Sequence, residues 1–283
     1  MKAAVLGAGG QLGRALCAAL PDADAFTRDE LDIADADAVT AVDWSRYHTV
    51  FNAAAFTAVD AAETPDGRVA AWRANAAAVA HLARATGPGT TLVHVSTEYV
   101  FDGRHHGPIA EDAPLCPLSV YGASKAAGEL AATLAPRHYV VRTSWVVGEG
   151  GNFVRTMAGL AAHGVSPSVV ADQVGRLTFA DDLARGLVRL AAGGAPCGTY
   201  HVTNSGTPTS WATVARAVFD RLGRNPVDVL DTTTHAYFAN KPQAAARPLN
   251  SVLDLRKASA VGVELPPWPD ALAEYLEKEA TPR

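Results

Sequence analysis

A tyrosine and a lysine four residues apart, Tyr121 and Lys125, have the spacing that most directly indicates acid–base chemistry in this sequence. On a helix, residues four apart share one face. A phenol has an ordinary pKa of about 10, and a neighbouring ammonium lowers it so that a proton can be transferred at neutral pH. Such pairs are common, but here Ser96 and Thr97 follow a strand-like run at 92–95. A hydroxyl from one of them completes a set able to bind and protonate a carbonyl oxygen.

A glycine-rich loop near the N-terminus indicates a second function, the binding of a dinucleotide. Gly7, Gly10 and Gly13 follow the strand-like run 2–6 and precede a helical segment at 14–20. The first glycine permits a tight turn, the second lets the backbone approach a pyrophosphate, and the third lets helix and strand pack closely. The strand before the loop and the helix after it favour this interpretation over a purely structural turn.

The residue after the second predicted strand indicates which dinucleotide is preferred. That strand ends near 25–27 and is followed by Arg28, where NAD-selective proteins commonly place an acidic residue. A guanidinium suits a 2′-phosphate, so NADPH is favoured over NADH. The alternative is that Asp29 or Glu30 turns back to bind a ribose hydroxyl.

Asp32 and Ile33 precede the next predicted helix, which begins near Ala34. In folds of this kind an aspartate at this point often lies beside the adenine. Asp32 is equally well explained as a cap for that helix.

The elements that must position these residues alternate along the first half of the chain. Apolar runs of strand length are separated by segments of helical period such as 66–86. This alternation predicts an α/β fold of Rossmann type, a doubly wound parallel sheet covered on both faces. The four clearest strands are expected at 2–6, 49–53, 91–96 and 138–142.

The alternation weakens after about residue 145, where a smaller C-terminal α/β substrate domain is expected. We assign 1–145 and 179–204 to a dinucleotide-binding domain, and 146–178 and 205–283 to a substrate-binding domain. The later elements expected are helices at 151–163, 180–192, 210–222 and 269–279 and strands at 168–171 and 199–202.

The composition excludes several classes of protein. The 283 residues are 48% hydrophobic and 19% charged with a net charge of −5, which gives no reason to expect long disorder, nucleic acid or an anionic membrane. Three scattered cysteines, Cys17, Cys116 and Cys197, form no CxxC spacing, so neither a disulfide framework nor a zinc site is indicated. No run reaches the roughly 18 apolar residues of a membrane span, and a cytoplasmic protein is expected.

Longer motifs carry a resemblance to a known family. The sequence resembles the extended short-chain dehydrogenase/reductases and, within them, the dTDP-4-dehydrorhamnose reductase family. The glycine loop and the Tyr–Lys pair are common to the whole superfamily. More specific to the reductase branch are NAAAFTAVD at 52–60, RTSW at 142–145 and ARPLNSVLD at 246–254.

The resemblance implies reduction of the C4 ketone of a dTDP-4-dehydro-6-deoxy-hexose, in the commonest case dTDP-4-dehydro-L-rhamnose to dTDP-L-rhamnose. Thr97 would bind the ketone oxygen, Tyr121 would donate the proton, and Lys125 would be its partner. The other residues that the resemblance places at the site are Gly10, Gln11 and Leu12 at the dinucleotide phosphates, Ala53, Ala54 and Ala55 under the cofactor, Glu98 and Trp145 at the sugar, and Asn152 and Arg247 at the diphosphate.

Two of these assignments have a structural alternative, because Trp145 is also explained as a core residue and Arg247 as a salt bridge holding a C-terminal loop. The sequence departs from the family at Glu98, where an aspartate is usual, and at Val147 and Leu177, which replace a tyrosine and a proline and are expected to change the pocket lining.

Ala15 stands where some relatives have a glutamate that helps to bind magnesium between two subunits. With alanine there, no metal is expected, although a homodimer through helix faces is compatible with the sequence.

Two other functions fit the same motifs. One is a 4-ketoreductase for another dTDP-4-keto-6-deoxy sugar of secondary metabolism, since C4 epimers differ only in the ketone face that meets the hydride. The other is a non-catalytic dinucleotide-binding regulatory subunit, which the complete set of Thr97, Tyr121 and Lys125 argues against.

Overall fold

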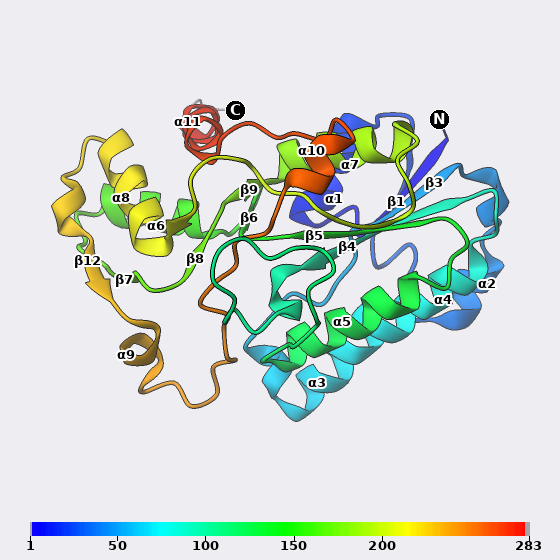
Figure 1. Ribbon diagram of the computed structural model, residues 1–283, viewed down its shortest axis with the longest axis horizontal. Coiled ribbons are helices and arrows are strands. Elements are labelled where there is room, and N and C mark those ends of the chain that lie inside the picture. Colours follow the sequence, from blue (N-terminus) through cyan, green and yellow to red (C-terminus); the bar gives the residue numbers. More distant parts are fainter. Residues whose placement is uncertain (1, 281–283) are drawn as a thin grey trace.

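A parallel sheet forms the centre of the structure, a computed structural model that describes residues 2–280 (Figure 1). The chain adds β2 on one side of β1 and then crosses to place β3 on the other, so the order of winding reverses between β1 and β3. This is the topology of the doubly wound α/β folds, and the predicted fold class is confirmed. The strands, in spatial order, are β2 (Asp24–Phe26), β1 (Ala3–Leu6), β3 (Thr49–Asn52), β4 (Thr91–Thr97), β5 (His138–Thr143) and β10 (Gly198–His201).

Helices cover both faces of this sheet because its strands alternate apolar side chains between the two faces. Val5 and Phe51 point to one face, where they pack in a core with residues of α1 and α7, whereas Leu6 and Val50 point to the other, with residues of α2 and α4. Figure 1 shows α1 and α7 on one side of the sheet and α3, α4 and α5 on the other. The bounds of these helices are α1 Gln11–Ala19, α2 Ala36–Ala41, α3 Pro65–Trp72, α4 Ala78–Ala85, α5 Val120–Ala132 and α7 Ala180–Ala192.

The helix expected over 66–86 contains a π-helical turn at Arg73–Ala77, which separates α3 from α4. Asn75 in this turn bonds through its amide to both Phe56 backbone groups and to the Ser124 hydroxyl. Such bulges are frequent at functional sites. Helical periodicity alone gives no sign of one extra residue in a turn.

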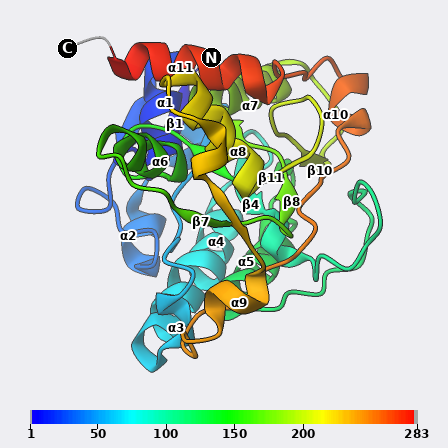
Figure 2. The same cartoon turned by 90° about the vertical axis from the view of Figure 1, so that its left-hand side faces the viewer.

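A second core lies beside the C-terminal ends of the sheet strands (Figures 1 and 2). Buried residues of α6, α8 and α11 pack there around Leu177, Phe179 and Trp268. Its elements are β6 (Val146–Val147), α6 (Phe153–Ala162), β7 (Ser168–Val170), β8 (Val174–Gly175), β9 (Thr178–Phe179), β11 (Thr209–Ser210), α8 (Trp211–Arg221), β12 (Leu230–Thr232), α9 (Thr234–Phe238) and α11 (Trp268–Ala280), with parallel pairs β6–β9 and β7–β12 and the antiparallel pair β8–β11.

The second core agrees in outline with the proposed substrate domain, but one segment of it packs elsewhere. The short helix α10 (Arg256–Ala260) and the residues after it contribute Ala258, Val263 and Leu265 to the first core, beside α7 and β10. The division of the chain into 1–145 with 179–204 and 146–178 with 205–283 therefore stays a proposal.

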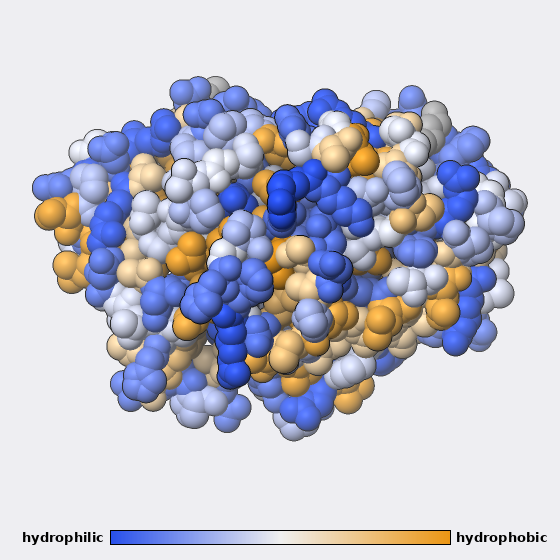
Figure 3. All heavy atoms as spheres, viewed as in Figure 1, coloured by the Kyte–Doolittle hydropathy of each residue, from blue (hydrophilic) through white to orange (hydrophobic). Residues whose placement is uncertain are grey.

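Several apolar side chains remain exposed on the helices of one sheet face. Val69 and Trp72 on α3, Leu130 on α5 and Leu134 just after it are between 43% and 65% exposed. Figure 3 shows apolar residues gathered over the region where Figure 1 places α5. Among residues 2–280, no helix combines the length and the apolar character that crossing a membrane requires.

Candidate active site

The glycine loop has the close backbone packing that its sequence predicts. Gly7 has a φ of +76°, and a Cβ there would lie 2.7 Å from the Cα of Ala54. A Cβ on Gly13 would collide with the carbonyl of Gly7. Helix α1 then begins at Gln11 without any side-chain cap on its first turn. An uncapped helix N-terminus behind a loop of bare backbone is a binding place for an anionic group such as a pyrophosphate.

A cavity of about 320 Å³ extends from this loop along the C-terminal ends of β1, β2 and β3. Gln11 and Leu12 line a neighbouring cavity, which shares Gly10, Ala53 and Ala55 with the first. The predicted cofactor residues that line the first cavity are Gly7, Gly10, Arg28, Asp32, Ile33, Ala53, Ala54 and Ala55.

The residues after β2 favour Arg28 over its acidic neighbours as the cofactor-selecting residue. The Glu30 carboxylate accepts hydrogen bonds from the backbone N–H and the hydroxyl of Thr27, at 2.8 and 2.7 Å. These bonds lower the pKa of Glu30 and hold its carboxylate close to the backbone of its own turn. Arg28 lines the cavity, whereas neither Asp29 nor Glu30 does.

Asp32 lines the same cavity and does not cap a helix that begins at Ala34. Its carboxylate accepts from the Ala34 N–H, but α2 begins at Ala36 and is capped by Asp35, which accepts from two backbone N–H groups of the first turn. The expected start of this helix was therefore two residues early.

The second cavity, of about 430 Å³, holds the three predicted catalytic side chains. Thr97 ends β4, and its hydroxyl caps the short turn that follows. Ser119 caps α5, which places Tyr121 in the first turn of that helix and Lys125 one turn later. Strand β4 and helix α5 thus bring Thr97, Tyr121 and Lys125 to one wall of the cavity.

The charges in this cavity differ from the expectation for Tyr121. We expected Lys125 to lower the pKa of the phenol, but burial and the Glu98 carboxylate raise it, opposed by a hydrogen bond with Thr97. The Lys125 ammonium instead donates to the Val95 carbonyl at 2.6 Å, and its burial lowers its pKa to about 8. Tyr121 therefore holds its proton at neutral pH, as a proton donor must.

Glu98 is a buried carboxyl that accepts the Thr97 hydroxyl proton at 2.7 Å. Burial raises its pKa to about 7, while the bond from Thr97 opposes the rise. The side chain that departs from the family pattern thus titrates near neutrality beside both Thr97 and Tyr121.

Trp145 is both a lining residue of this cavity and part of the second core. It has a φ of +47°, a left-handed conformation that costs energy in a residue other than glycine. Its indole stacks on Trp211 with ring centroids 3.8 Å apart and borders the second core. The core interpretation of Trp145 is therefore confirmed, whereas its contact with a sugar stays a prediction, and the stack with Trp211 fixes the indole in place.

The two residues predicted at the diphosphate have partners within the protein, and their contact with a diphosphate stays a prediction. Asn152 caps α6, and its amide donates to the Gly148 carbonyl and to the Tyr275 hydroxyl. Arg247 pairs with Asp60 at 2.8 and 2.9 Å, as in its structural alternative. Neither side chain lines the 430 Å³ cavity.

The substitutions at Val147 and Leu177 do not change the lining of the catalytic cavity. Both side chains are buried in the second core, with 2% and 0% exposure. The expectation that they alter the sugar pocket directly was wrong, because β6 at Val147 and the segment between β8 and β9 at Leu177 turn these side chains into the second core.

Sequence reasoning missed several lining residues, and three of them have large side chains suited to binding a ligand. Arg73 reaches the first cavity from the π-helical turn, and Tyr99 and Trp211 line the second. Tyr99 packs edge-on against Tyr121 with ring centroids 5.4 Å apart. Tyr99 lies in the STEYVFDG motif beside Thr97 and could have been noted, but Arg73 and Trp211 stand in helical segments without any local signal.

Comparison with known proteins shows the family to which the chain belongs. The family model for the RmlD substrate binding domain matches residues 1–281. The chain belongs to the dTDP-4-dehydrorhamnose reductase family. It is 42% identical to a dTDP-4-dehydrorhamnose reductase of Streptomyces griseus over 95% of this chain and 91% of that protein.

Two further relatives bear on its activity and its fold. A protein of Streptomyces antibioticus named as a probable dTDP-4,6-dihydroxy-2-methyloxan-3-one 4-ketoreductase is 40% identical, covering 97% of this chain and 94% of its own. The crystal structure of dTDP-4-dehydrorhamnose reductase from Bacillus anthracis, solved in complex with NADP, has a TM-score of 0.90 and 35% identity. It covers 98% of this chain and 99% of that one. Similarity at this coverage confirms the family and the fold that the motifs predicted.

Proposed function

We propose that this family member reduces the C4 ketone of a dTDP-4-dehydro-6-deoxy-hexose with NADPH, and that its main reaction is dTDP-4-dehydro-L-rhamnose to dTDP-L-rhamnose. The observation that carries the proposal is the convergence of Thr97, Tyr121 and Lys125 on a cavity that adjoins the glycine-loop cavity. A cofactor bound along the loop and a ketone held at Thr97 would then meet at the carboxyl ends of the strands, where open parallel sheets bind ligands.

The residues of the cavity can perform the proton transfer. A bound nicotinamide supplies the hydride to the ketone carbon. Tyr121 donates a hydrogen bond to the ketone oxygen, and Thr97 donates a second when its hydroxyl turns from Glu98 to the ketone. The phenol then gives up its proton as negative charge develops there. Lys125, buried one turn after Tyr121 on the same face of α5, would bind the nicotinamide ribose hydroxyls.

The first cavity fits a dinucleotide with a 2′-phosphate. The loop is closed to any side chain at Gly7 and Gly13, so the backbone itself faces the pyrophosphate. Arg28 and Arg73 line the cavity from opposite segments, and both are exposed cations with room to bind an anion. Gln11 and Leu12 in the first turn of α1 supply N–H groups between the two cavities.

A 4-ketoreductase for another dTDP-4-keto-6-deoxy sugar is the second candidate function. It is favoured by the name of the Streptomyces antibioticus relative and by Glu98, a longer side chain at the sugar end than the family's usual aspartate. A purely regulatory role is opposed by the complete acid–base set, buried and assembled.

A cytoplasmic location is part of the proposal. Cys17, Cys116 and Cys197 are free, as is usual for proteins kept in a reducing compartment. A homodimer through helix faces stays a prediction, for which the exposed apolar side chains of α3 and α5 offer a surface.

The test is to mix the purified protein with NADPH and a panel of dTDP-4-keto-6-deoxy sugars, follow NADPH oxidation, and identify each product by NMR. Selective turnover of dTDP-4-dehydro-L-rhamnose to the L-rhamnose product supports the main proposal. Preference for another 4-keto sugar supports the second candidate. NADPH binding without turnover of any sugar would contradict both.

A further inference from the structure

A buried ion pair lies directly behind the proposed catalytic residues and has no part in the proton transfer itself. The side chains of Glu129 and Arg142 are each 5% exposed. The guanidinium donates three hydrogen bonds to the carboxylate, at 2.8, 2.9 and 3.1 Å. Removing two charges from water is expensive, and an apolar pair of the same size is often as stable. A pair buried this completely therefore calls for an explanation other than stability.

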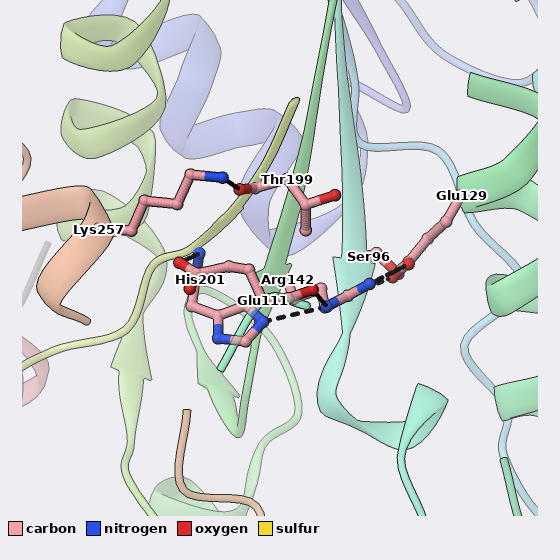
Figure 4. Close-up of polar contacts among 7 residues, drawn as sticks. All are labelled: Ser96, Glu111, Glu129, Arg142, Thr199, His201 and Lys257. Carbon is pink, nitrogen blue, oxygen red and sulfur yellow. Dashed lines mark hydrogen bonds and ion pairs between the residues drawn. The ribbon is translucent and has the colours of Figure 1, made fainter. Parts of the chain in front are cut away.

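The pair joins α5, β4 and β5, three of the elements that line the catalytic cavity (Figure 4). Glu129 lies on α5 one turn after Lys125 and two turns after Tyr121, and all three are buried. Its carboxylate also accepts the Ser96 hydroxyl of β4 at 2.6 Å. Arg142 lies opposite Ser96 in the register of β5 against β4. The Glu129 carboxylate thus connects α5, which carries Tyr121 and Lys125, to β4, in which Thr97 follows Ser96.

Three further contacts hold the Arg142 guanidinium on the side away from Glu129. Its guanidinium donates to the Glu111 carbonyl at 3.0 Å, lies over the Phe101 ring, and contacts the His201 ring nitrogen at 3.3 Å. Burial and Arg142 itself lower the pKa of His201 to about 3, so this histidine is neutral and accepts the contact without adding charge. Figure 4 shows the chain of contacts running from Ser96 and Glu129 through Arg142 to His201.

We propose that Glu129 and Arg142 are positioning residues for the reduction, which fix α5 against β4 so that Tyr121 and Lys125 face Thr97. This inference rests on the proposed function for its catalytic readout. The Lys125 ammonium and the Glu129 carboxylate bind consecutive residues of β4, at the Val95 carbonyl and the Ser96 hydroxyl. A slip or tilt of α5 would break both bonds and displace the phenol from Thr97. A misplacement of about 1 Å at a reacting group can cost roughly a hundredfold in rate.

The pair also sets the charge around Lys125. Glu129 is the charged neighbour that favours the ammonium form against its burial. Two other groups near Lys125 are neutral. His94 on β4 is neutral because burial and the Lys125 ammonium lower its pKa, and Tyr121 holds its proton. Glu98 is turned to Thr97, and Arg142 is paired with Glu129 itself. Loss of the Glu129 carboxylate should therefore lower the pKa of Lys125, and loss of the Arg142 guanidinium should raise it.

The experiment compares Glu129→Gln with Arg142→Gln. Each should lower kcat roughly a hundredfold, with a smaller change in KM. In Glu129→Gln the loss of activity at alkaline pH should begin below the wild-type position near pH 8, because the Lys125 ammonium has lost its stabilising charge. In Arg142→Gln the loss of activity should begin at a higher pH than in the wild type. A merely structural role would give no such opposed shifts.

Two controls separate positioning from folding. Arg224 makes the same three kinds of contact at the edge of the second core, with Asp228, the Ala161 carbonyl and the Phe219 ring, so Arg224→Gln should leave kcat and its pH profile unchanged. The double variant Glu129→Met with Arg142→Met should remain folded, since no charge is left unpaired, but stay impaired in kcat.

Binding of NADPH without sugar, measured across the same pH range, distinguishes this inference from the proposed function. If the wild-type protein reduces no sugar, the proposed function fails, while opposed pH shifts in NADPH affinity still support the role of the pair. Near-native kcat in the folded double variant, or parallel pH profiles in Glu129→Gln and Arg142→Gln, would overturn the inference.

Discussion

The two ends of the binding site are built in different ways. At the cofactor end, Gly7, Gly10 and Arg28 come from adjacent turns of the first two βα connections, and the backbone itself forms much of the surface. At the sugar end, Glu98, Trp145 and Trp211 come from three distant segments, and side chains form the surface. The cofactor end therefore depends on local conformation, and the sugar end on how the two cores pack against each other.

The largest expected effect is at the sugar end, where one hydroxyl carries the proton. Tyr121→Phe should lower turnover by about 10²–10⁴-fold, the usual contribution of a positioned acid, while NADPH affinity stays near wild type. Turnover and NADPH binding are measured on the same preparation. Tyr139→Phe is the matched control, since the Tyr139 hydroxyl bonds only the Ala195 carbonyl at the far end of β5. Turnover of Tyr121→Phe within a few-fold of wild type would contradict the assignment.

At the cofactor end, a single methyl group should have the next largest effect. Gly7→Ala places a Cβ 2.7 Å from the Ala54 Cα at a positive φ, so the loop must move away from the pyrophosphate position. We expect NADPH affinity to fall by about tenfold or more. Gly107 also has a positive φ but faces open space, so Gly107→Ala should affect binding little. Equal NADPH affinity in both variants would show that the loop does not form the phosphate site.

A smaller effect is expected from the side chain that selects the cofactor. Arg28→Ala should reduce the preference for NADPH over NADH by roughly tenfold, mainly through the KM for NADPH, since a hydrogen bond to a charged group is worth about 1.5–3 kcal/mol. Arg68→Ala, an exposed arginine of α3 outside the cavity, is the control. A wild-type protein that prefers NADH would assign another role to Arg28.

Glu98 should make the folded protein less stable as pH rises, whereas most carboxyls make it more stable. Its pKa is raised to about 7 in the folded protein, so the unfolded chain binds fewer protons between pH 4.5 and 7, and stability falls as pH rises through that window. Glu98→Gln should remove this loss and raise the free energy of unfolding above pH 7 by about 3 kcal/mol. Denaturation of both proteins at pH 5 and pH 8 measures the difference, which should nearly vanish at the lower pH.

The smallest expected effect is that of removing divalent metal. In the proposed mechanism Thr97 and Tyr121 hold the ketone, so we expect the reaction to require no Lewis acid. Ala15 lines a surface pocket with Asp181 and Glu274, but among residues 2–280 no three metal-ligating side chains converge. Activity and oligomer mass should survive dialysis against EDTA. Loss of either, restored by magnesium, would show that the pocket binds metal despite the alanine.

The sequence by itself determined the cofactor end, because its features are local. A strand, a glycine turn and a helix fix their own geometry within a few residues, so the roles of Gly7 and Gly13 follow from spacing alone. The pairing of Tyr121 with Lys125 is equally local, since one turn of α5 sets it. The same holds for the strand and helix boundaries, which periodicity predicts closely for α7 and β4.

Only the tertiary structure decided the sugar end and the charges in the site. The stack of Trp145 on Trp211 joins residues 66 positions apart, and no local sequence pattern predicts that these two indoles pack together. Asn152 and Arg247 are polar groups that found partners in Tyr275 and Asp60, because a polar side chain bonds whatever packing brings near it. The pKa of Tyr121 was raised rather than lowered for the same reason: burial depends on the packing of the whole chain, whereas spacing along a helix does not report it.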